Sequence, residues 1–393
     1  KKYSMKSFDT IHLSVPDDCI DISKKLKNYS YGQRYNSETH EIIEKGLSED
    51  RLNPNVKQNH FDIKIPGVSH ITHIPDYNKF DIKFSSKILR GNYTEGITQK
   101  SIKDVVQILE SAGVGEIYTD MFVENSIVRV CDNTYNIELD NGKIETYLDC
   151  LDLIITQGKK GKIQSYKNDN TKSKNFDSVV IGKTTNKLQK ITIYNKIEEA
   201  IASAPSGVGN YNSFIMKEYG MNWADFHDYF NNKLRVELRV TNQEHLRKLY
   251  TNKKSPQKVT LEDILLSKKN AILHQWDSFV NEGLTNHTIK YFDMTHKERE
   301  LYKLGSFSKA ANWALLKEFV VICDGDTDRV RDKIQKLYYT NDDGTPRKVS
   351  PSVLKDLVMF CSDYRRVKRL GLSPADGWTL KYKEVRSKLA KVG

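Results

Sequence analysis

Several segments of the chain alternate hydrophobic and polar residues with a period of two, which is typical of strands that bury one face. The cleanest is KLRVELRV, residues 233–240, where one face is aliphatic and the other carries Arg235, Glu237 and Arg239. The same alternation, or an apolar run of strand length, predicts further strands at residues 7–16, 60–66, 78–86, 116–119, 126–131 and 147–156.

Two more short strands are predicted within residues 179–200, VVIGKTTNKLQKITIYNKIEEA, around a turn at residues 186–187. In the second strand two isoleucines face one way, so Tyr194 falls on the opposite, polar face together with Lys190. A helix is expected to begin near Lys196, because two glutamates follow it and carboxylates favour the first turn of a helix.

Helical periodicity is clearest in residues 101–113. Ser101 and Asp104 predict a capping box at its start, and Gly113 predicts its end. Further helices are expected within residues 212–230.

Residues 295–322 predict two helices around a tight turn at Gly305. The second helix is capped by Ser308 and carries Lys309 and Asn312 near its start. This arrangement is typical of a helix-turn-helix that binds DNA, although any pair of packed helices gives a similar pattern.

Strands interrupted by helices predict an α+β fold, with a mainly antiparallel sheet and helices packed on its apolar face. Its polar face is expected to present Asp81, Lys83, Tyr194, Arg235, Glu237 and Arg239. With 393 residues the chain is long enough for several parts. We predict a sheet domain at residues 1–250, a helical connector at 251–294, and a helix-turn-helix-like domain with a basic tail at 295–393.

The formal charge of +11 indicates a polyanionic partner, most often a nucleic acid. Nine lysines fall within residues 158–190, directly before Tyr194, against two aspartates. The 21 tyrosines favour DNA, because aromatic rings can stack on unpaired bases. A solvated lysine-rich loop is the alternative interpretation of this segment.

Five cysteines without CxxC spacing fit a reducing cytoplasm, and neither a disulfide framework nor a zinc knuckle. No apolar run approaches the roughly 18 residues that a membrane span needs, and no signal-peptide pattern opens the chain. A soluble cytoplasmic protein without a membrane partner is therefore expected.

Tyr194 and Lys196 bring a phenol and an ammonium group within two residues, and Glu199 follows in the predicted helix. This combination can form a covalent nucleophile with a charged partner. A tyrosine at the end of a strand is more commonly an amphipathic residue at the rim of a sheet.

The order of these segments resembles the gene II/X family of phage and plasmid replication proteins, the rolling-circle initiators of filamentous phages and related replicons. The resemblance covers roughly residues 8–330. It rests on the blocks DTIHLSVP, FDIKFSSKILRGN, LDLII, IYNKIEEA, LRVELR and GSFSKAANWALLKEF, which stand in the family's order.

The resemblance implies a replication-initiator fold of the HUH-nuclease type and a metal-assisted transesterification. The family's Y-x-K-x-x-E falls on Tyr194, Lys196 and Glu199. Tyr194 is thereby implied to attack a DNA phosphodiester, form a 5′-phosphotyrosine and free a 3′-hydroxyl primer. Lys196 is expected to favour the phenolate or to neutralise the phosphorane.

Mg²⁺ or Mn²⁺ is the expected cofactor, because oxygen-rich ligands select these ions over zinc. Asp152 and Glu237 are the predicted ligands, with Asp81 as a third. The family's arginine two residues before Asp152 is Cys150 in this chain, so the charge partner of Asp152 is missing. The alternative role of Glu237 is a structural ladder with its two flanking arginines.

His70 and His73 invite comparison with the paired histidines of other rolling-circle nucleases. Their spacing would put the two rings on opposite faces of a strand, and the loop predicted at residues 70–78 favours solvent-exposed histidines. We therefore leave them out of the predicted site.

DNA contacts are expected from the sheet, the lysine-rich loop, the helix-turn-helix and the tail. The predicted residues are Lys83, Lys87, Lys183, Lys187, Lys190, Arg235, Arg239, Lys309, Asn312, Arg365 and Arg366. The expected partners are a replication origin, in single-stranded or supercoiled DNA, and a helicase and polymerase of a bacterial host.

Two other functions fit the same features. One is a noncatalytic repressor that binds an origin or operator through the same polar sheet face. The other is a conjugative relaxase or a transposase, which would use the same tyrosine chemistry on a different DNA.

Overall fold

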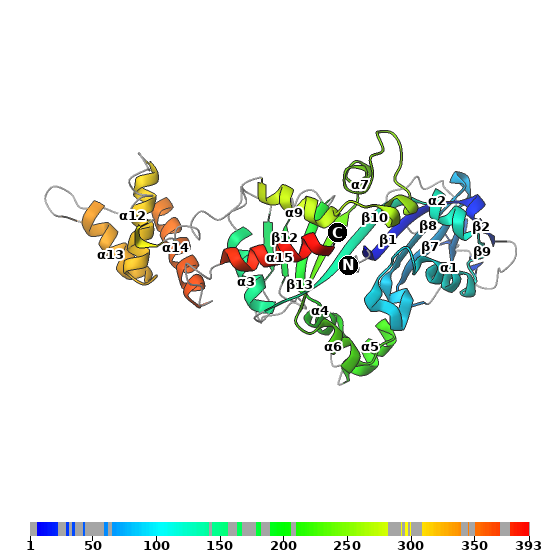
Figure 1. The fold of residues 1–393 in the computed structure, drawn as a ribbon, viewed down its shortest axis with the longest axis horizontal. Helices are drawn as coiled ribbons and strands as arrows, with labels where there is room; N and C mark the ends of the chain where they lie inside the picture. The colour runs from blue at the N-terminus through cyan, green and yellow to red at the C-terminus, as the bar shows by residue number, and fades with distance from the viewer. Residues whose placement is uncertain are drawn as a thin grey trace.

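The alternating segments pair into one large sheet, in which every described strand runs antiparallel to its neighbours (Figure 1). The strand order is β11-β12-β13-β14-β10-β1-β8-β7-β6-β3. The bounds are β1 Ser7–Pro16, β3 Tyr29–Ser30, β6 Asn59–Phe61, β7 Val68–Ile74, β8 Lys79–Ser85, β10 Ile127–Glu138, β11 Ile163–Tyr166, β12 Ser178–Ile181, β13 Gln189–Asn195 and β14 Lys233–Val240.

The structure is a computed structural model. It describes residues 6–22, 29–30, 34–35, 42–43, 59–61, 65–140, 144–155, 163–166, 178–181, 189–205, 210–281, 292, 295–297, 299, 309–338, 345, 350–369 and 378–392. Two short strand pairs lie outside the large sheet. They are β2 Ile20–Asp21 with β9 Glu116–Ile117, and β4 Arg34–Tyr35 with β5 Ile42–Ile43.

Helices fill the connections between the strands and most of the described C-terminal third. The α-helices are α1 Ile102–Ser111, α2 Thr119–Asn125, α3 Ile144–Ile155, α4 Lys196–Ser203, α5 Tyr211–Tyr219, α6 Trp223–Phe230, α7 Gln243–Tyr250, α8 Leu261–Leu266, α9 Ala271–Asn281, α12 Lys309–Ile322, α13 Thr327–Tyr338, α14 Pro351–Arg369 and α15 Trp378–Val392. The 3₁₀ segment η4, Ser86–Glu95, follows β8. None of the described helices combines the length and apolar character that crossing a bilayer requires.

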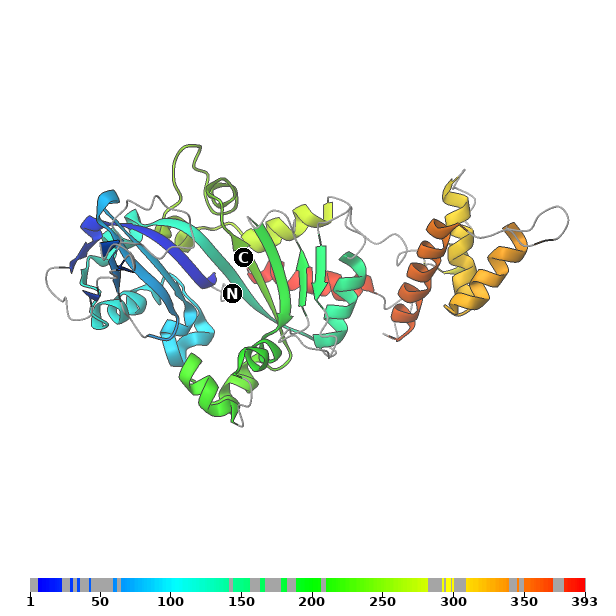
Figure 2. The ribbon, with the colours of Figure 1, turned by 180° about the vertical axis from the view of Figure 1, so that it is seen from behind.

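The two faces of the large sheet differ in chemistry, because side chains alternate along each strand. On one face, side chains such as Ile11, Ile82 and Leu238 are fully buried. Helices α3, α9 and α15 pack over strands β10 and β12–β14 on this face, in front of the sheet in Figure 1, and α2 packs on β1. Figure 2 shows the opposite side, where the strands lie in front of α15. We call that side the polar face. It carries Thr10, His12, His70, Asp81, Lys83, Asp132, Lys190, Tyr194, Arg235, Glu237 and Arg239.

The predicted α+β fold with a mainly antiparallel sheet is therefore confirmed, and so is the placement of the six predicted residues on its polar face. Burial drives this arrangement. Each large aliphatic side chain that leaves water contributes about 1.5–3 kcal/mol, so a register that exposed the apolar face would be strongly disfavoured.

The C-terminal helix α15 returns to the sheet. Val385 and Leu389 join the core beneath the strands, and Arg386 forms an ion pair of 2.7 Å with Asp277 on α9. Trp276 of α9 is buried in the same core. The predicted boundaries at residues 251 and 295 are thus too simple, because α8, α9 and α15 all complete the sheet domain.

Helices α12, α13 and α14 form a second unit with a core of its own, beside the sheet in Figure 1. Val320, Val330 and Phe360 are buried in that core. The predicted second helix of the helix-turn-helix corresponds to α12. Most of its predicted partner helix and the turn at Gly305 lie outside the described residues.

Three local predictions were wrong. Residues 147–155 belong to helix α3, not to a strand, because an apolar run of this length suits a buried helix equally well. Strand β7 continues to Ile74 and so occupies the first part of the loop predicted at residues 70–78. Ser101 makes no side-chain cap on α1 and instead donates to the Gly96 carbonyl oxygen. The turn at residues 186–187 lies outside the described residues.

The core position of α15 can be tested with Leu389→Ala. We expect this change to lower the free energy of unfolding by about 3 kcal/mol, because it opens a cavity beneath the sheet. Lys391→Ala, on an exposed position of the same helix, should stay within about 0.5 kcal/mol. Urea unfolding followed by circular dichroism measures both, and an unchanged midpoint for Leu389→Ala would contradict the assignment.

Candidate active site

Tyr194 ends β13 on the polar face, directly before α4. Its hydroxyl donates a hydrogen bond of 2.6 Å to Glu237 Oε1 on the neighbouring strand β14. The residue is only 4% exposed. Burial, and then the Glu237 carboxylate, raise the pKa of Tyr194 well above its ordinary value, against the opposing effect of Lys196 and Arg235. The phenol is therefore neutral here and has a proton acceptor in place.

Arg235 connects the acceptor to β1. Its Nε donates to Glu237 Oε1 at 2.7 Å, and its Nη2 donates to Asp9 Oδ1 at 2.7 Å. Asp9 lies in a β-bulge between Phe8 and Thr10 and also accepts from Ser86 Oγ at 2.8 Å. Burial alone would raise the pKa of Asp9, but the Arg235 charge and other cations hold it below its usual range. Asp9 and Glu237 thus both accept hydrogen bonds from one buried guanidinium.

Lys196 is the second buried cation of this group. Its Nζ donates to Glu199 Oε2 at 2.6 Å and lies 5.7 Å from the Tyr93 ring centre and 5.5 Å from that of Tyr219. Burial opposes its charge, but Glu199 and the surrounding phenols raise the pKa of Lys196 well above its ordinary value. The residues of the Y-x-K-x-x-E motif therefore meet in space, and the ammonium group is oriented by Glu199. We call Tyr194, Glu237, Arg235, Asp9 and Lys196 the tyrosine cluster.

Asp132 lies on β10, where it pairs opposite Arg239. The closest approach is 3.8 Å, from Arg239 Nε to Asp132 Oδ1, and the arginine side chain is 40% exposed. Burial raises the pKa of Asp132 to about 7, with Glu237 and Asp9 adding to the effect of burial and Arg239 opposing it. The sequence analysis did not predict Asp132 as a site residue, because polar and apolar residues do not alternate regularly around it.

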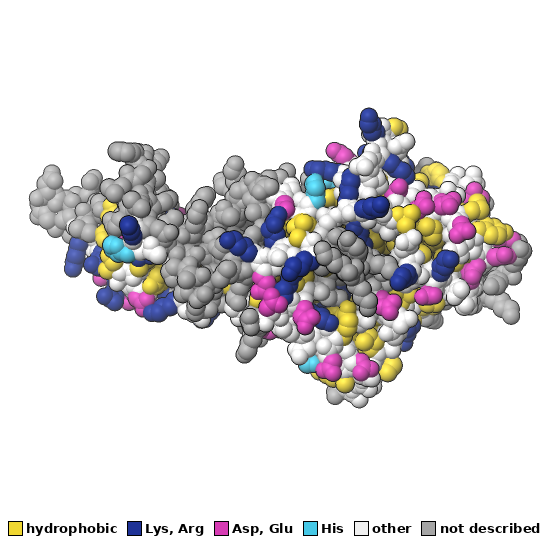
Figure 3. Space-filling view, viewed as in Figure 1, with side chains coloured by type: hydrophobic (Ala, Val, Ile, Leu, Met, Phe, Trp, Pro, Cys, Tyr) yellow, Lys and Arg dark blue, Asp and Glu magenta, His cyan; other side chains and the backbone are white. Residues whose placement is uncertain are grey.

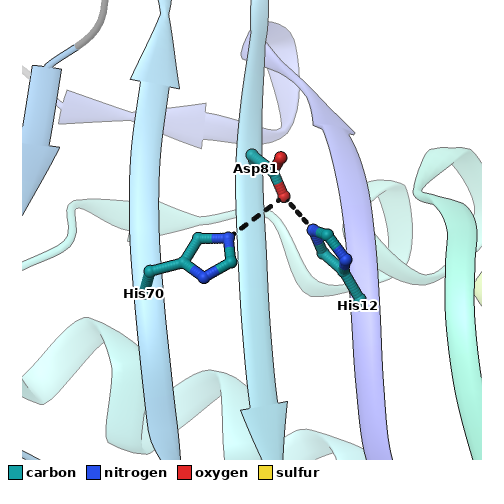
Figure 4. Close-up of side chains that lie close together, drawn as sticks. All are labelled: His12, His70 and Asp81. Atoms are coloured by element: carbon teal, nitrogen blue, oxygen red, sulfur yellow. Dashed lines mark hydrogen bonds and ion pairs between the residues drawn. The ribbon is translucent and has the colours of Figure 1, made fainter. Parts of the chain in front are cut away.

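Three other side chains meet farther along the polar face. His12 from β1 and His70 from β7 both point to Asp81 on the strand between them (Figure 4). One ligand atom from each lies within 4.8 Å of the others. Burial would raise the pKa of Asp81, but hydrogen bonds from both histidines, together with Arg129, hold it well below its usual range. We call His12, His70 and Asp81 the cation cluster.

The donor set of the cation cluster fits a divalent ion of the first transition series. Two imidazoles and a carboxylate suit Mn²⁺, Fe²⁺ or Zn²⁺, whereas Mg²⁺ prefers oxygen ligands alone. Of the two ions expected from the sequence, the cluster therefore favours Mn²⁺. His12 was not among the predicted ligands, although its alternation within residues 7–16 places it on the same face as Asp81.

The tyrosine cluster and the cation cluster do not share one position. Tyr194 pairs with Arg235 on β14, and Arg235 pairs in turn with Asn136 on β10. His12 pairs with Val130, also on β10. This register separates Tyr194 from His12 by three strands and six residues, which corresponds to on the order of 20 Å. Asp81 is therefore not a partner of Glu237, contrary to the predicted ligand set.

Asp152 is also separated from Glu237. It lies on α3, which packs on the apolar face of the sheet, whereas Glu237 projects from the polar face. The strand on which the predicted pairing of Asp152 with Glu237 depended is therefore a helix in this chain.

His70 and His73 lie on opposite faces of β7, as their spacing predicts. His70 faces Asp81, while His73 is buried, stacks on Phe80 at 4.5 Å and contacts Asp17 Oδ2 at 3.1 Å. Both lie in a strand and not in the predicted loop, and His73 is buried, whereas the His70 side chain is 40% exposed. His70 belongs to the cation cluster, with a partner other than His73.

The predicted DNA contacts fall into three groups. Lys190 is exposed, and Lys83 and Arg239 are partly exposed on the polar face. Arg235 is buried and forms ion pairs with Asp9 and Glu237. The pair with Glu237 is one half of the structural Arg-Glu-Arg ladder that was the alternative role of Glu237. Lys87 forms an ion pair of 3.2 Å with Glu218 on α5.

The remaining contacts lie toward the C-terminal half or outside the described residues. Arg365 donates to the Gly325 carbonyl oxygen at 2.9 Å, and Arg366 lies 3.9 Å from Asp149 on α3. Lys309 and Asn312 are on α12, while Lys183 and Lys187 lie outside the described residues. On the face shown in Figure 3, described lysines and arginines are interspersed with acidic groups and form no single basic stripe.

No protein-family model and no curated protein matches this chain. The resemblance to the gene II/X family, drawn from the order of the motifs, therefore stays a prediction.

The raised pKa of Asp132 gives a prediction for stability. The carboxyl's contribution to stability is present below its ordinary pKa of 3.8 and is lost as the pH rises through about 7. The side chain in Asp132→Asn is neutral at every pH. The free energy of unfolding of this variant, relative to that of the parent, should therefore rise by about 3 kcal/mol between about pH 4 and pH 7 and then level off. Urea unfolding at a series of pH values measures the difference, and the exposed Asp104→Asn serves as control. A difference that does not vary with pH would contradict the prediction.

The cation cluster predicts a binding site for Mn²⁺. We expect His12→Ala to weaken Mn²⁺ binding by more than about 100-fold, because loss of a ligand costs more than loss of an outer hydrogen-bond partner. Isothermal titration calorimetry at neutral pH measures the affinity. His296→Ala, at an exposed position outside the cluster, should bind like the parent. Equal affinities for the parent and His12→Ala would exclude this site.

Proposed function

We propose that the protein is a DNA nicking and closing enzyme that initiates rolling-circle replication, with Tyr194 as the nucleophile. The observation that carries the proposal is the 2.6 Å hydrogen bond from Tyr194 Oη to Glu237 Oε1. It pairs the phenol with a group that can take its proton, beside the buried cations Lys196 and Arg235. The motif order shared with the gene II/X family supports the same assignment.

The reaction is a transesterification at a DNA phosphate. Glu237 accepts the phenolic proton while the Tyr194 oxygen attacks phosphorus, and the bond from phosphorus to the 3′-oxygen breaks. Lys196 and Arg235 stabilise the negative charge that develops on the phosphorane oxygens. Because one phosphoester replaces another, attack by a 3′-hydroxyl on the phosphotyrosine rejoins the strand.

Access to the phenol depends on DNA. Tyr194 is 4% exposed and neutral, so it is protected from reaction when no DNA is bound. DNA binding has to displace the side chains over the phenol before attack. Exposed Lys190 and partly exposed Lys83 and Arg239 on the polar face supply positive charge for the DNA backbone.

The finer fold assignment, an HUH-type nuclease, is supported by the two histidines and the carboxylate on the polar face of an antiparallel sheet. His12, His70 and Asp81 would hold the metal, which when bound would supply positive charge for a DNA phosphate. Since the cation cluster lies on the order of 20 Å from Tyr194, we assign it to a phosphate other than the one attacked.

A noncatalytic origin-binding repressor is the second candidate. The burial of Tyr194 favours it, because a covered phenol cannot reach a phosphate without a change in the protein. A conjugative relaxase or a transposase would use the same residues on a different DNA, so the sequence of the cleaved DNA decides between these enzymes.

Covalent attachment to DNA tests the proposal. The protein is incubated with Mn²⁺ and a labelled pool of single-stranded oligonucleotides of random sequence, alongside supercoiled plasmid carrying its replicon. We expect a protein linked to a 5′ end, with the nucleotide on Tyr194 by mass spectrometry. Tyr194→Phe should lower adduct formation by roughly four orders of magnitude or more, since it removes the nucleophile.

Tyr118→Phe, an exposed tyrosine on the same domain, is the matched control and should react like the parent. An adduct on another tyrosine would overturn the assignment of Tyr194. Tight, salt-sensitive binding to the replicon without any cleavage would favour the repressor.

A further inference from the structure

Asp132 lies on the polar face next to the tyrosine cluster, and the mechanism above leaves it without a role. It pairs opposite Arg239, and its same-face neighbour Thr134 pairs opposite Glu237. Asp132 and Glu237 are therefore diagonal neighbours on adjacent strands, which puts their backbones about 7 Å apart. Asp132 is therefore the carboxyl next along the polar face from the group that accepts the Tyr194 hydroxyl.

The Asp132 carboxyl is buried, and its Oδ1 has no hydrogen-bond partner among the described residues. Arg239 Nε, at 3.8 Å, is beyond hydrogen-bond distance. The charged groups that face Asp132 are Arg239 and Glu237 from β14, Asp9 from β1 and Lys190 from β13. With two cations and two carboxylates around it, burial decides the outcome and keeps the proton on the carboxyl up to about pH 7.

We propose that Asp132 donates a proton to the 3′-oxygen that leaves when Tyr194 attacks, and takes the same proton back when the strand is rejoined. This inference rests on the proposed nicking and closing function. It gives the two neighbouring carboxyls opposite roles: Glu237, which accepts hydrogen bonds from Arg235 and Tyr194, is the base, and Asp132, buried and without a hydrogen-bond partner on Oδ1 among the described residues, is the acid.

The step balances in protons and bonds. The bond from the Tyr194 oxygen to phosphorus forms, and the bond from phosphorus to the 3′-oxygen breaks with its electron pair going to that oxygen. The phenolic proton moves to Glu237, and the Asp132 proton moves to the 3′-oxygen. Rejoining reverses every transfer, so neither an oxidant nor a second co-reactant is required.

The geometry distinguishes this role from a structural ion pair. Arg235, which does have a structural role, donates to both of its carboxylates at 2.7 Å and is 4% exposed. Arg239 approaches Asp132 no closer than 3.8 Å, with a side chain that is 40% exposed. An ion pair with a partly exposed arginine at this distance contributes little to stability, so a structural ion pair does not account for Asp132.

The test compares two leaving groups in single-turnover adduct formation. The substrates are the oligonucleotide that the parent protein cleaves and the same oligonucleotide with sulfur in place of the bridging 3′-oxygen. A thiol with a pKa of about 8.5 leaves without a proton donor, whereas an alkoxide does not. We expect Asp132→Asn to react about 100-fold more slowly than the parent with the oxygen substrate and about equally with the sulfur substrate.

The pH profile gives a second readout. For the parent and the oxygen substrate, the rate should fall as the pH rises above about 7, because Asp132 loses its proton. Asp132→Asn should lose this decrease, while the control Asp104→Asn keeps it. Equal slowing of Asp132→Asn on both substrates indicates a structural role and overturns the inference alone.

Infrared difference spectroscopy on the parent provides a measurement that needs no activity. A protonated carboxyl band that disappears near pH 7, and is absent in Asp132→Asn, supports the inference. A carboxyl that titrates near pH 4 overturns it. If the parent forms no tyrosine-linked adduct with any substrate, the proposed function itself fails, which is distinct from these outcomes.

Discussion

The buried guanidinium of Arg235 is the interaction on which the rest of the site depends. It joins β14 to β1 through Asp9 and holds Glu237 in position to accept the Tyr194 hydroxyl. A charge at 4% exposure is stable only with its partners in place, since loss of one partner of a buried pair costs roughly 3–5 kcal/mol. The geometry around the phenol is thereby fixed by the stability of the sheet itself.

The same constraint explains how neighbouring carboxyls on one sheet face differ. Asp9 and Glu237 both accept hydrogen bonds from Arg235, whose charge holds the pKa of Asp9 below its usual range. Asp132 lies on β10, diagonal to Glu237, and is also buried. The arginine opposite it, Arg239, is partly exposed and stays 3.8 Å away, so burial raises the pKa of Asp132 to about 7. Register alone decides which carboxyl meets the guanidinium, and a bulge in β1 brings Asp9 to it.

The sequence predicted those features that depend on local alternation. Residues 233–240 and the strand before Tyr194 were assigned to the correct faces, because burial of one face dictates a period of two. Asp9 and His12 were missed, since their importance comes from partners on strands distant in sequence. Asp152 was misplaced because residues 147–155 are apolar and short, and such a run does not distinguish a buried strand from a helix.

The two polar clusters act at a distance from each other. Asp81 holds His12 and His70 at one end of the polar face, while Arg235 holds Glu237 and Asp9 at the other. A separation on the order of 20 Å exceeds the reach of any one phosphate. A strand of DNA laid along the polar face would meet both clusters only at different nucleotides. In the proposed nicking reaction, binding at one cluster would therefore set which phosphate reaches the other, and the spacing of the two clusters would contribute to the choice of cleavage site.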